Sequence, residues 1–462
     1  MPLRQWKIRM AVLGMLVVLA GSLTPRAYAS SATLLLEEPY GKLGFFTATG
    51  HAAVYMSDVC ADTPVHLRRC KPGETGVVLS RYDGVGGYDW IAIPLVPYLY
   101  AVEKPQDIPL FADPKMVGFL RDRYRRAHLE DIAPDTADSG TPNGNWYELV
   151  GTSYDRTVYG YEIETTPARD AALIRKLNAS PNRSHFHTVS NNCADFAKDI
   201  INFYYPRTLH RSIVADVGMT TPKQMAKMLD KFGNRHSELQ FSRLVISQVP
   251  GSVPRSTAVH GVVESFFKSK KYIVPSAFAS PIFAGCIFAV YVGSVAGRFD
   301  PGHDALVYNA SSEPELPLRR DDRLAYQKEL ESLLARDTEG TDMRVEKSWG
   351  RLQAKAKADV DEHGMPVLQM QLGEEKVSLG IAAENILKSD APPQLIQQLL
   401  EARLQSELQR WATSRVSVSE VARDWRLLQQ ARSADSKDSA DAVAPSAPEI
   451  SAQNESAAGS RR

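Results

Sequence analysis

The stretch "TVSNNCADFAKDIINFYY", residues 188–205, joins a polar cluster to an amphipathic run and places one cysteine at the junction. Within it, Phe196, Ile200 and Phe203 recur at spacings of four and three residues, which predicts a helix with one apolar stripe. Pro206 follows and stops the helix. The stretch therefore predicts a helix that starts beside the cysteine and ends just before this proline.

The cysteine of this stretch, Cys193, falls at or beside the first turn of the predicted helix. Asn191 or Asn192 is a good N-cap, and Asp195 suits the first turn. Unpaired backbone N–H groups and the positive end of the helix dipole favour a thiolate there. We therefore expect the pKa of Cys193 to fall below the usual value of about 8.5, as it does in an activated nucleophile.

A thiolate that transfers acyl groups also needs a proton donor for the leaving group, usually a histidine. His51 begins a predicted strand of small residues in "GHAAVY", which leaves room for a packed helix end. His185 and His187 share one face of a second predicted strand, "SHFHTV", close to Cys193 in the sequence. These three histidines are the candidates for the partner of the thiol.

The same histidines raise a metal site as an alternative, with His and Cys side chains as zinc ligands. The chain contains neither an HExxH nor a CxxC pattern, and two histidines on a strand are more often structural. A structural role is also the plain alternative for Cys193, as a small residue at a helix start, and for His51, as a core histidine. We expect no metal and no other cofactor.

The first residues predict export from the cytoplasm. A basic segment precedes the apolar run "MAVLGMLVVLAGSL" (residues 10–23), and the sequence "AYA" just before Ser30 suits signal peptidase. We expect residues 1–29 to be a cleaved signal peptide and the protein to lie in the periplasm or cell envelope. A retained membrane anchor is the alternative.

An oxidising compartment changes the interpretation of the cysteines. Cys60 and Cys70 bracket the short polar stretch "ADTPVHLRR" and are expected to close a disulfide loop, with His66 exposed inside it. Cys286 lies in "FAGCIFAV" and is expected to be a buried apolar residue. Cys193 is then left without a cysteine partner.

Composition and patterning divide the chain into parts. Of 462 residues, 54 are basic and 54 acidic, a balance that gives no indication of a nucleic-acid partner. Strand and helix signals alternate without a regular βαβ rhythm in the first part, which predicts an α+β domain. The expected parts are a signal peptide (1–29), an α+β domain (30–235), a linker (236–319), a mainly helical module with a hairpin (320–432) and a disordered tail (433–462).

The expected linker contains an apolar segment, residues 272–297, that has no charged residue. Its length suits a membrane-spanning helix. Pro275 and Pro281 interrupt it, however, and the basic run "KSKK" (268–271) precedes it. A membrane span and a buried or interfacial helix pair both remain open, and membrane association through this segment is an expectation of the sequence.

The order of two motifs resembles that of the circularly permuted papain-like thiol hydrolases, a group with NlpC-type and lecithin retinol acyltransferase-like members. In that group a histidine strand precedes a cysteine helix. Gly50-His51 and "NCADF" (192–196) match these two places, and the resemblance covers roughly residues 33–205. It implies an α+β fold in which an antiparallel sheet packs against the cysteine-bearing helix.

The resemblance also implies roles for individual residues. Cys193 would be the nucleophile, His51 the general base and acid, and the backbone N–H of Cys193 part of the oxyanion hole. The group uses a third polar residue on the next strand, commonly histidine; here "GVVLSRY" offers Ser80, Arg81 and Tyr82, and we nominate Ser80.

The sequence therefore predicts an exported cysteine-dependent hydrolase or acyltransferase. Its substrate would be a peptide-derived or lipid-derived amide or ester, at the cell wall or membrane. The alternative is a catalytically inactive hydrolase-like domain that serves as a binding or assembly module in the envelope.

Overall fold

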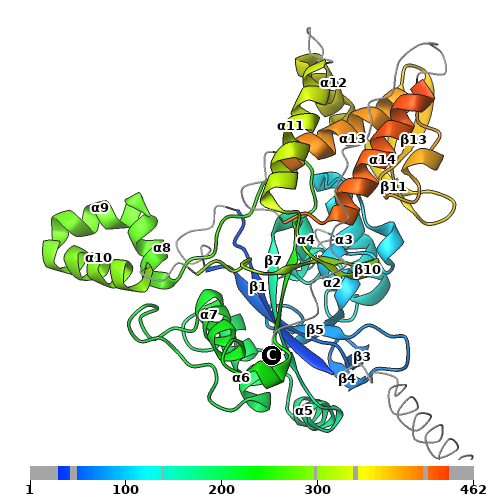
Figure 1. Cartoon of the computed structure of the whole chain (residues 1–462). Helices are drawn as coiled ribbons and strands as arrows, with labels where there is room; N and C mark the ends of the chain where they lie inside the picture. The colour runs from blue at the N-terminus through cyan, green and yellow to red at the C-terminus, as the bar shows by residue number, and fades with distance from the viewer. Residues whose placement is uncertain are drawn as a thin grey trace, which may run out of the picture.

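The computed structural model describes residues 30–41, 49–137, 140, 142, 144–295, 299–336, 342–408 and 415–435. The protein is α+β: a large mixed sheet lies at the centre, helices cover it, and a mainly helical region with a small sheet follows towards the C-terminus (Figure 1). The expected signal peptide lies outside the described residues, and so does the expected disordered tail beyond residue 435.

The central sheet has eight strands in the order β10-β9-β8-β7-β1-β2-β5-β6. Its strands are β1 (Ser31–Glu37), β2 (His51–Met56), β5 (Val77–Ser80), β6 (Ile91–Pro94), β7 (Val158–Glu164), β8 (Ser242–Ile246), β9 (Leu306–Asn309) and β10 (Ser312–Glu315). Neighbours are antiparallel except β8 and β9, which are parallel. The sheet is therefore mixed, and the expectation of an antiparallel sheet is corrected.

The expected linker, residues 236–319, is also corrected, because it supplies the three strands β8, β9 and β10 of the central sheet. Parallel neighbours require a crossover connection. The chain between β8 and β9 provides it by leaving the sheet, forming three helices and returning to the same edge.

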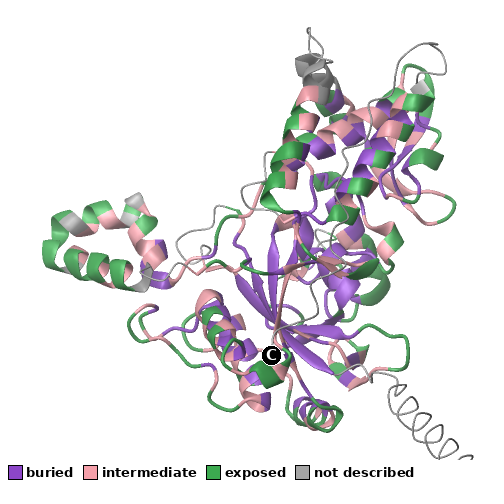
Figure 2. Ribbon diagram, viewed as in Figure 1, coloured by how far each residue is buried: buried purple, intermediate pink, exposed green. Residues whose placement is uncertain are grey.

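Helices cover both faces of the sheet because its strands alternate apolar residues between two cores. Leu34 and Val54 belong to one core, and Leu35 and Ala53 belong to the other. The first core packs under α5 (Pro167–Ala179), α6 (Cys193–Tyr204) and α7 (Pro222–Gly233); the second packs under α2 (Leu95–Tyr100), α3 (Pro114–His128) and α4 (Thr152–Asp155). Figure 2 shows the strands as the most deeply buried elements.

The C-terminal region shares the second core. Its elements are α11 (Arg320–Arg336), α12 (Asp342–Lys355), β11 (Lys357–Val360), β12 (Pro366–Leu372), β13 (Glu375–Gly380), α13 (Pro393–Leu408) and α14 (Val418–Asp435). The predicted hairpin is confirmed as β12 and β13, joined at Gly373 and Glu374. Gln353 Nε2 donates to Asp113 Oδ2 at 2.6 Å, and Arg403 donates to the carbonyl of Leu110, so the region is docked on the segment that leads into α3.

Short elements complete the description. The hairpin of β3 (Val59–Thr63) and β4 (His66–Arg69) carries the expected Cys60–Cys70 disulfide, which the structure confirms, and His66 is exposed beside it. The described part of the chain also contains the 3-10 helices η2 (Pro105–Asp107), η3 (Trp146–Glu148), η4 (Ser237–Leu239) and η5 (Ile386–Lys388).

The apolar segment forms part of a helical arm, residues 262–295, that projects from the body of the protein (Figure 1). The arm comprises α8 (Val262–Lys268), α9 (Lys270–Ala279) and α10 (Pro281–Val295). No helix in the described part of the chain is long and apolar enough to cross a membrane. Cys286 on α10 is exposed, so the prediction that it is buried was wrong: the arm has no core to bury it in.

Candidate functional site

Cys193 is the first residue of α6, as the sequence predicts. Asn192 is the N-cap: its Oδ1 accepts from the Asp195 N–H at 3.0 Å, and the Asn192 N–H donates to Asp195 Oδ2 at 3.3 Å. This reciprocal capping box satisfies two backbone donors and fixes where the helix starts. The Asn192 amide also donates to the carbonyls of Thr188 and Thr220, so the loops on both sides are tied to the helix start.

His51 is the first residue of β2, and it is buried. Its Nε2 lies 2.7 Å from Ser80 Oγ on β5, the neighbouring strand, so the structure brings together the two residues nominated from the sequence. The ring of Tyr82 stacks on the imidazole, with ring centres 4.7 Å apart and planes 9° apart. These two contacts hold the imidazole from its edge and from its face.

The backbone geometry explains why a glycine, Gly50, precedes this histidine. Its φ is +71°, in the left-handed region, and a Cβ at this position would lie 2.1 Å from the carbonyl oxygen of Glu37. Only glycine fits both the conformation and the space. The tight approach places His51 directly opposite Glu37 on β1.

Cys193 and His51 line the same cavity of about 360 Å³, because α6 packs against β2. Cys193 is partly accessible, and the backbone N–H groups of Ala52 and Ala194 act on its thiol. Ala52 follows His51 on β2, so the thiol lies against the start of that strand. Within the described residues no hydrogen bond joins the Cys193 thiol to the His51 ring, an arrangement common in substrate-free sites.

Burial decides the protonation of both groups. It raises the pKa of Cys193 to about 11; the N–H groups of Ala52 and Ala194 oppose this shift, and Glu37 and Glu148 add to it. Burial also lowers the pKa of His51 to about 3, helped by the positive charge of Arg156 and opposed by Glu148. The thiolate expected at the helix N-terminus is therefore not the resting form: at neutral pH, thiol and imidazole are both uncharged.

Arg81 follows Ser80 and positions the start of α6. Its Nη2 donates to Asp89 at 2.7 Å and its Nη1 to Asn191 at 2.6 Å. The guanidinium also lies over the ring of Phe196, 5.0 Å from its centre. The strand that carries the histidine's partner is thereby fastened to the helix that carries the cysteine.

A buried polar network surrounds Glu37, the residue opposite His51, and the sequence did not predict it. Arg156 lies 3.2 Å from Glu37 and 3.4 Å from Glu148, and Thr152 and Tyr98 both donate to Glu37. Tyr82, the residue stacked on the imidazole, donates to the Glu148 carbonyl at 2.9 Å and contacts the hydroxyl of Tyr98.

The only local signal for this network was the pair Glu37-Glu38 at the end of an apolar strand. The partners meet because β1 pairs with β2 on one side and with β7 on the other. That register is a property of the folded sheet, so the network could not be assembled from short stretches of sequence.

His185 and His187 are not on a strand, so that prediction was wrong. Both are exposed in a loop, where the His187 N–H bonds the Asn191 carbonyl and closes a turn instead of pairing with the sheet. His185 Nδ1 lies 3.4 Å from Asp89.

Within the described residues, two other groups bring together side chains that bind metals. One contains Cys60 and Cys70, whose sulfurs form the disulfide; the other contains Glu407, Glu420 and Asp424. Arg403 reaches all three carboxylates at 2.7 to 3.1 Å and Arg423 pairs with Asp424 at 2.9 Å, so guanidinium groups already occupy this cluster.

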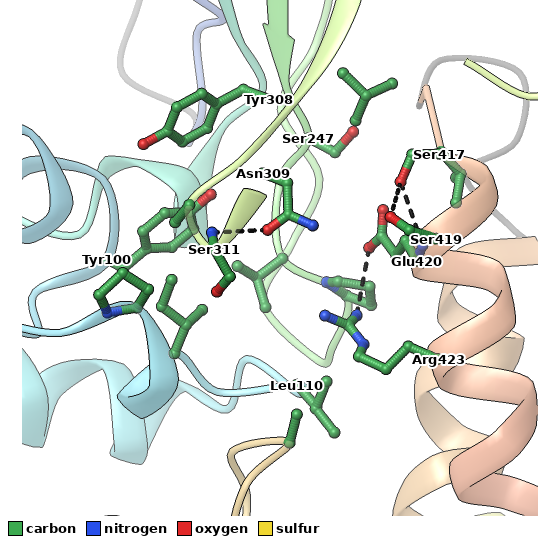
Figure 3. Close-up of a pocket in the computed structure, with 18 of the residues that line it drawn as sticks. Tyr100, Leu110, Ser247, Tyr308, Asn309, Ser311, Ser417, Ser419, Glu420 and Arg423 are labelled. Atoms are coloured by element: carbon green, nitrogen blue, oxygen red, sulfur yellow. Dashed lines mark hydrogen bonds and ion pairs between the residues drawn. The ribbon is translucent and has the colours of Figure 1, made fainter. Parts of the chain in front are cut away.

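A second cavity, of about 420 Å³, lies where α2 and the β9–β10 hairpin face α13 and α14. Figure 3 shows Tyr100, Asn309, Ser419 and Arg423 around it, with the Ser311 N–H donating to Asn309 at 2.9 Å. Its lining contains neither cysteine nor histidine, so it offers no thiol–imidazole pair.

Comparison with known proteins adds no relative: no family model, no curated protein and no solved structure matches the chain.

Proposed function

We propose that the protein is a cysteine-dependent hydrolase or acyltransferase of the permuted papain-like type, which acts on an amide or ester. The observation that carries the proposal is the placement of Cys193, at a capped helix start, in one cavity with a His51 that Ser80 holds by its Nε2. A nucleophile, a base and a residue that orients the base are the parts that thiol acyl transfer requires.

The neutral state of both groups sets the first step. Because Ser80 occupies Nε2, Nδ1 of His51 is left to take the thiol proton as the sulfur bonds to the substrate carbonyl carbon. The carbonyl electrons move to oxygen, and the helix-start N–H groups stabilise that oxyanion. When the tetrahedral intermediate collapses, the bond to the leaving group breaks and the imidazolium returns its proton to that group.

The product of this half-reaction is a thioester on Cys193. Water or a second acceptor then attacks the thioester carbonyl, with His51 again removing the proton. Phe186, Met219 and Pro222 line the cavity and offer apolar surface to an acyl chain or an apolar side chain. We further propose that the protein is exported, as its first residues predict, and meets a peptide or lipid substrate in the envelope.

The trapped intermediate tests this proposal. Incubation with p-nitrophenyl esters of increasing chain length and with peptide p-nitroanilides is expected to add one acyl group, which digestion and mass spectrometry locate on Cys193. Cys193→Ala should remove the adduct, and Cys286→Ala, which changes the exposed thiol of the arm, should keep it. Acylation confined to Cys286 or to lysines across the panel would contradict the proposal and favour the inactive binding module.

A further inference from the structure

The arm of α8, α9 and α10 exposes apolar side chains that a soluble protein normally buries. At the turn between α9 and α10, Phe278 is 86% exposed and Ile282 is 82% exposed, and Phe288 and Val292 on α10 are also exposed. Phe267 of α8 packs on α10, so the arm is held together from inside (ring centres 5.6 Å from Phe288). Figures 1 and 2 show it standing clear of the body, mostly in the exposed colour.

The composition of α10 indicates whether it suits a protein surface, a protein core or lipid. Its sequence, "PIFAGCIFAVYVGSV", carries apolar residues on every side and no charge. A helix that docks on one protein surface needs a single apolar stripe, whereas a helix that is apolar all round belongs in a protein core or in lipid. Since α10 contributes to neither core of the described residues, lipid suits it best.

A loop beside the base of the arm adds to the same face. Ile213, Val214 and Val217 are exposed, and Ile213 is 82% exposed. Asp216 in this loop accepts from the backbone N–H of Val262, the first residue of α8, at 2.9 Å. The loop and the arm are therefore joined, and their apolar side chains belong to one region of the surface.

A basic groove adjoins this region. Lys223, Lys227 and Lys231 follow each other at four-residue intervals along α7, which places them on one face of the helix. With Arg207 and Arg235 they line a cavity of about 620 Å³ whose wall includes Gly261 and Glu264 at the base of the arm. Lys223 pairs with Glu264 at 2.6 Å, and the side chains of Lys227 and Lys231 are exposed.

We propose that this face binds an anionic lipid bilayer: the arm enters the interface and the basic groove of α7 receives lipid phosphates. The two signals complement each other, because apolar burial anchors and basic residues select anionic lipid. With 15 residues α10 is about 22 Å long, shorter than the hydrocarbon core of about 30 Å, so the arm lies in the interface.

Membrane binding of this kind goes beyond the acyl-transfer chemistry and does not require it. The two sites adjoin, because Thr221 lines both the basic groove and the cavity of Cys193.

The exposed Cys286 on α10 provides the test. In the full chain carrying Cys193→Ala, Cys286 is labelled with an environment-sensitive dye and mixed with vesicles of phosphatidylcholine, alone or with one quarter phosphatidylglycerol. We expect the emission to shift to the blue and rise several-fold with the anionic vesicles, and less without them or in 0.5 M salt, which screens the lysines. A dye at Leu387→Cys on η5, in a chain without Cys193 and Cys286, is the matched control: Leu387 is exposed on the C-terminal region, and this dye should not respond.

Two sets of variants separate the signals. Lys227→Glu with Lys231→Glu should weaken binding to anionic vesicles at least tenfold, and Phe278→Asp with Ile282→Asp should remove the blue shift. A Cys286 dye that ignores both kinds of vesicle would overturn the proposal. So would a shift that depends on protein concentration without lipid, because the arm would then be covered by a second copy of the chain.

Discussion

Replacement of His51 by alanine is expected to lower the rate at which p-nitrophenyl esters acylate Cys193 by about 10²- to 10⁴-fold, the usual range for loss of a general base. The pKa of Cys193 is raised to about 11, so very little thiolate is present at neutral pH and the attack depends on a base. His51, with a pKa lowered to about 3, stays uncharged throughout the neutral range, and its role as the base rests on its place in the same cavity as Cys193. Release of p-nitrophenol, followed with excess ester, measures the rate.

Ser80→Ala is the graded control for that experiment. It removes the 2.7 Å contact to Nε2 but leaves the imidazole in place, so we expect a loss of about tenfold, as for one hydrogen bond worth about 1 to 1.5 kcal/mol. Circular dichroism should show both variants folded. Acylation of the His51→Ala protein at the wild-type rate would remove His51 from the mechanism.

Arg156→Met is expected to destabilise the protein by about 3–5 kcal/mol, the cost of leaving a buried charge without its partner. Arg156 and Glu37 are both buried and lie 3.2 Å apart, and Glu37 is the residue of β1 opposite His51. Thr152 and Tyr98 cannot supply the lost positive charge. Urea unfolding, followed by tryptophan fluorescence, measures the free energy of unfolding.

Arg126→Met is the matched control for this arginine. Arg126 also pairs with two carboxylates, Asp122 and Asp135, but its side chain is more than half exposed. Solvent screens such pairs, so we expect a much smaller loss of stability than for Arg156→Met. Equal losses of stability in the two variants would show that the buried Arg156–Glu37 pair stabilises the fold no more than an exposed ion pair does.

The elements that place the nucleophile could be predicted because their signals are local. All of these signals lie within residues 192–200: the N-cap Asn192, the first-turn residue Asp195 and the apolar stripe of Phe196 and Ile200. The helix α6 starts where they indicate. The small residues after His51 likewise predict β2. The partner of His51 came from the resemblance, which implies a third polar residue on the next strand; Ser80 was nominated from the three polar residues there, and it lies against Nε2.

What the sequence could not provide depends on distant contacts. β8 joins the sheet before the arm, and β9 and β10 join it only after the chain has returned from the arm, so residues 236–319 resembled a linker. The alternation around His185 is typical of a strand, but the segment forms a loop, in which His187 pairs locally with Asn191. The pKa of Cys193 was expected to fall at a helix start, but burial under β2 outweighs the helix N-terminus.

The pH dependence of iodoacetamide labelling, measured separately for Cys193 and Cys286 by mass spectrometry, tests the central claim most directly. Between the two pKa values, about 3 and about 11, the fraction of molecules with a neutral thiol beside a neutral imidazole is constant. If His51 assists the thiol, labelling of Cys193 should therefore be nearly independent of pH from about 5 to 9. In His51→Ala only free thiolate reacts, and the rate should rise about tenfold per pH unit. The same tenfold rise in the wild-type protein would contradict the account, because Cys193 would then react as a thiol with no base beside it.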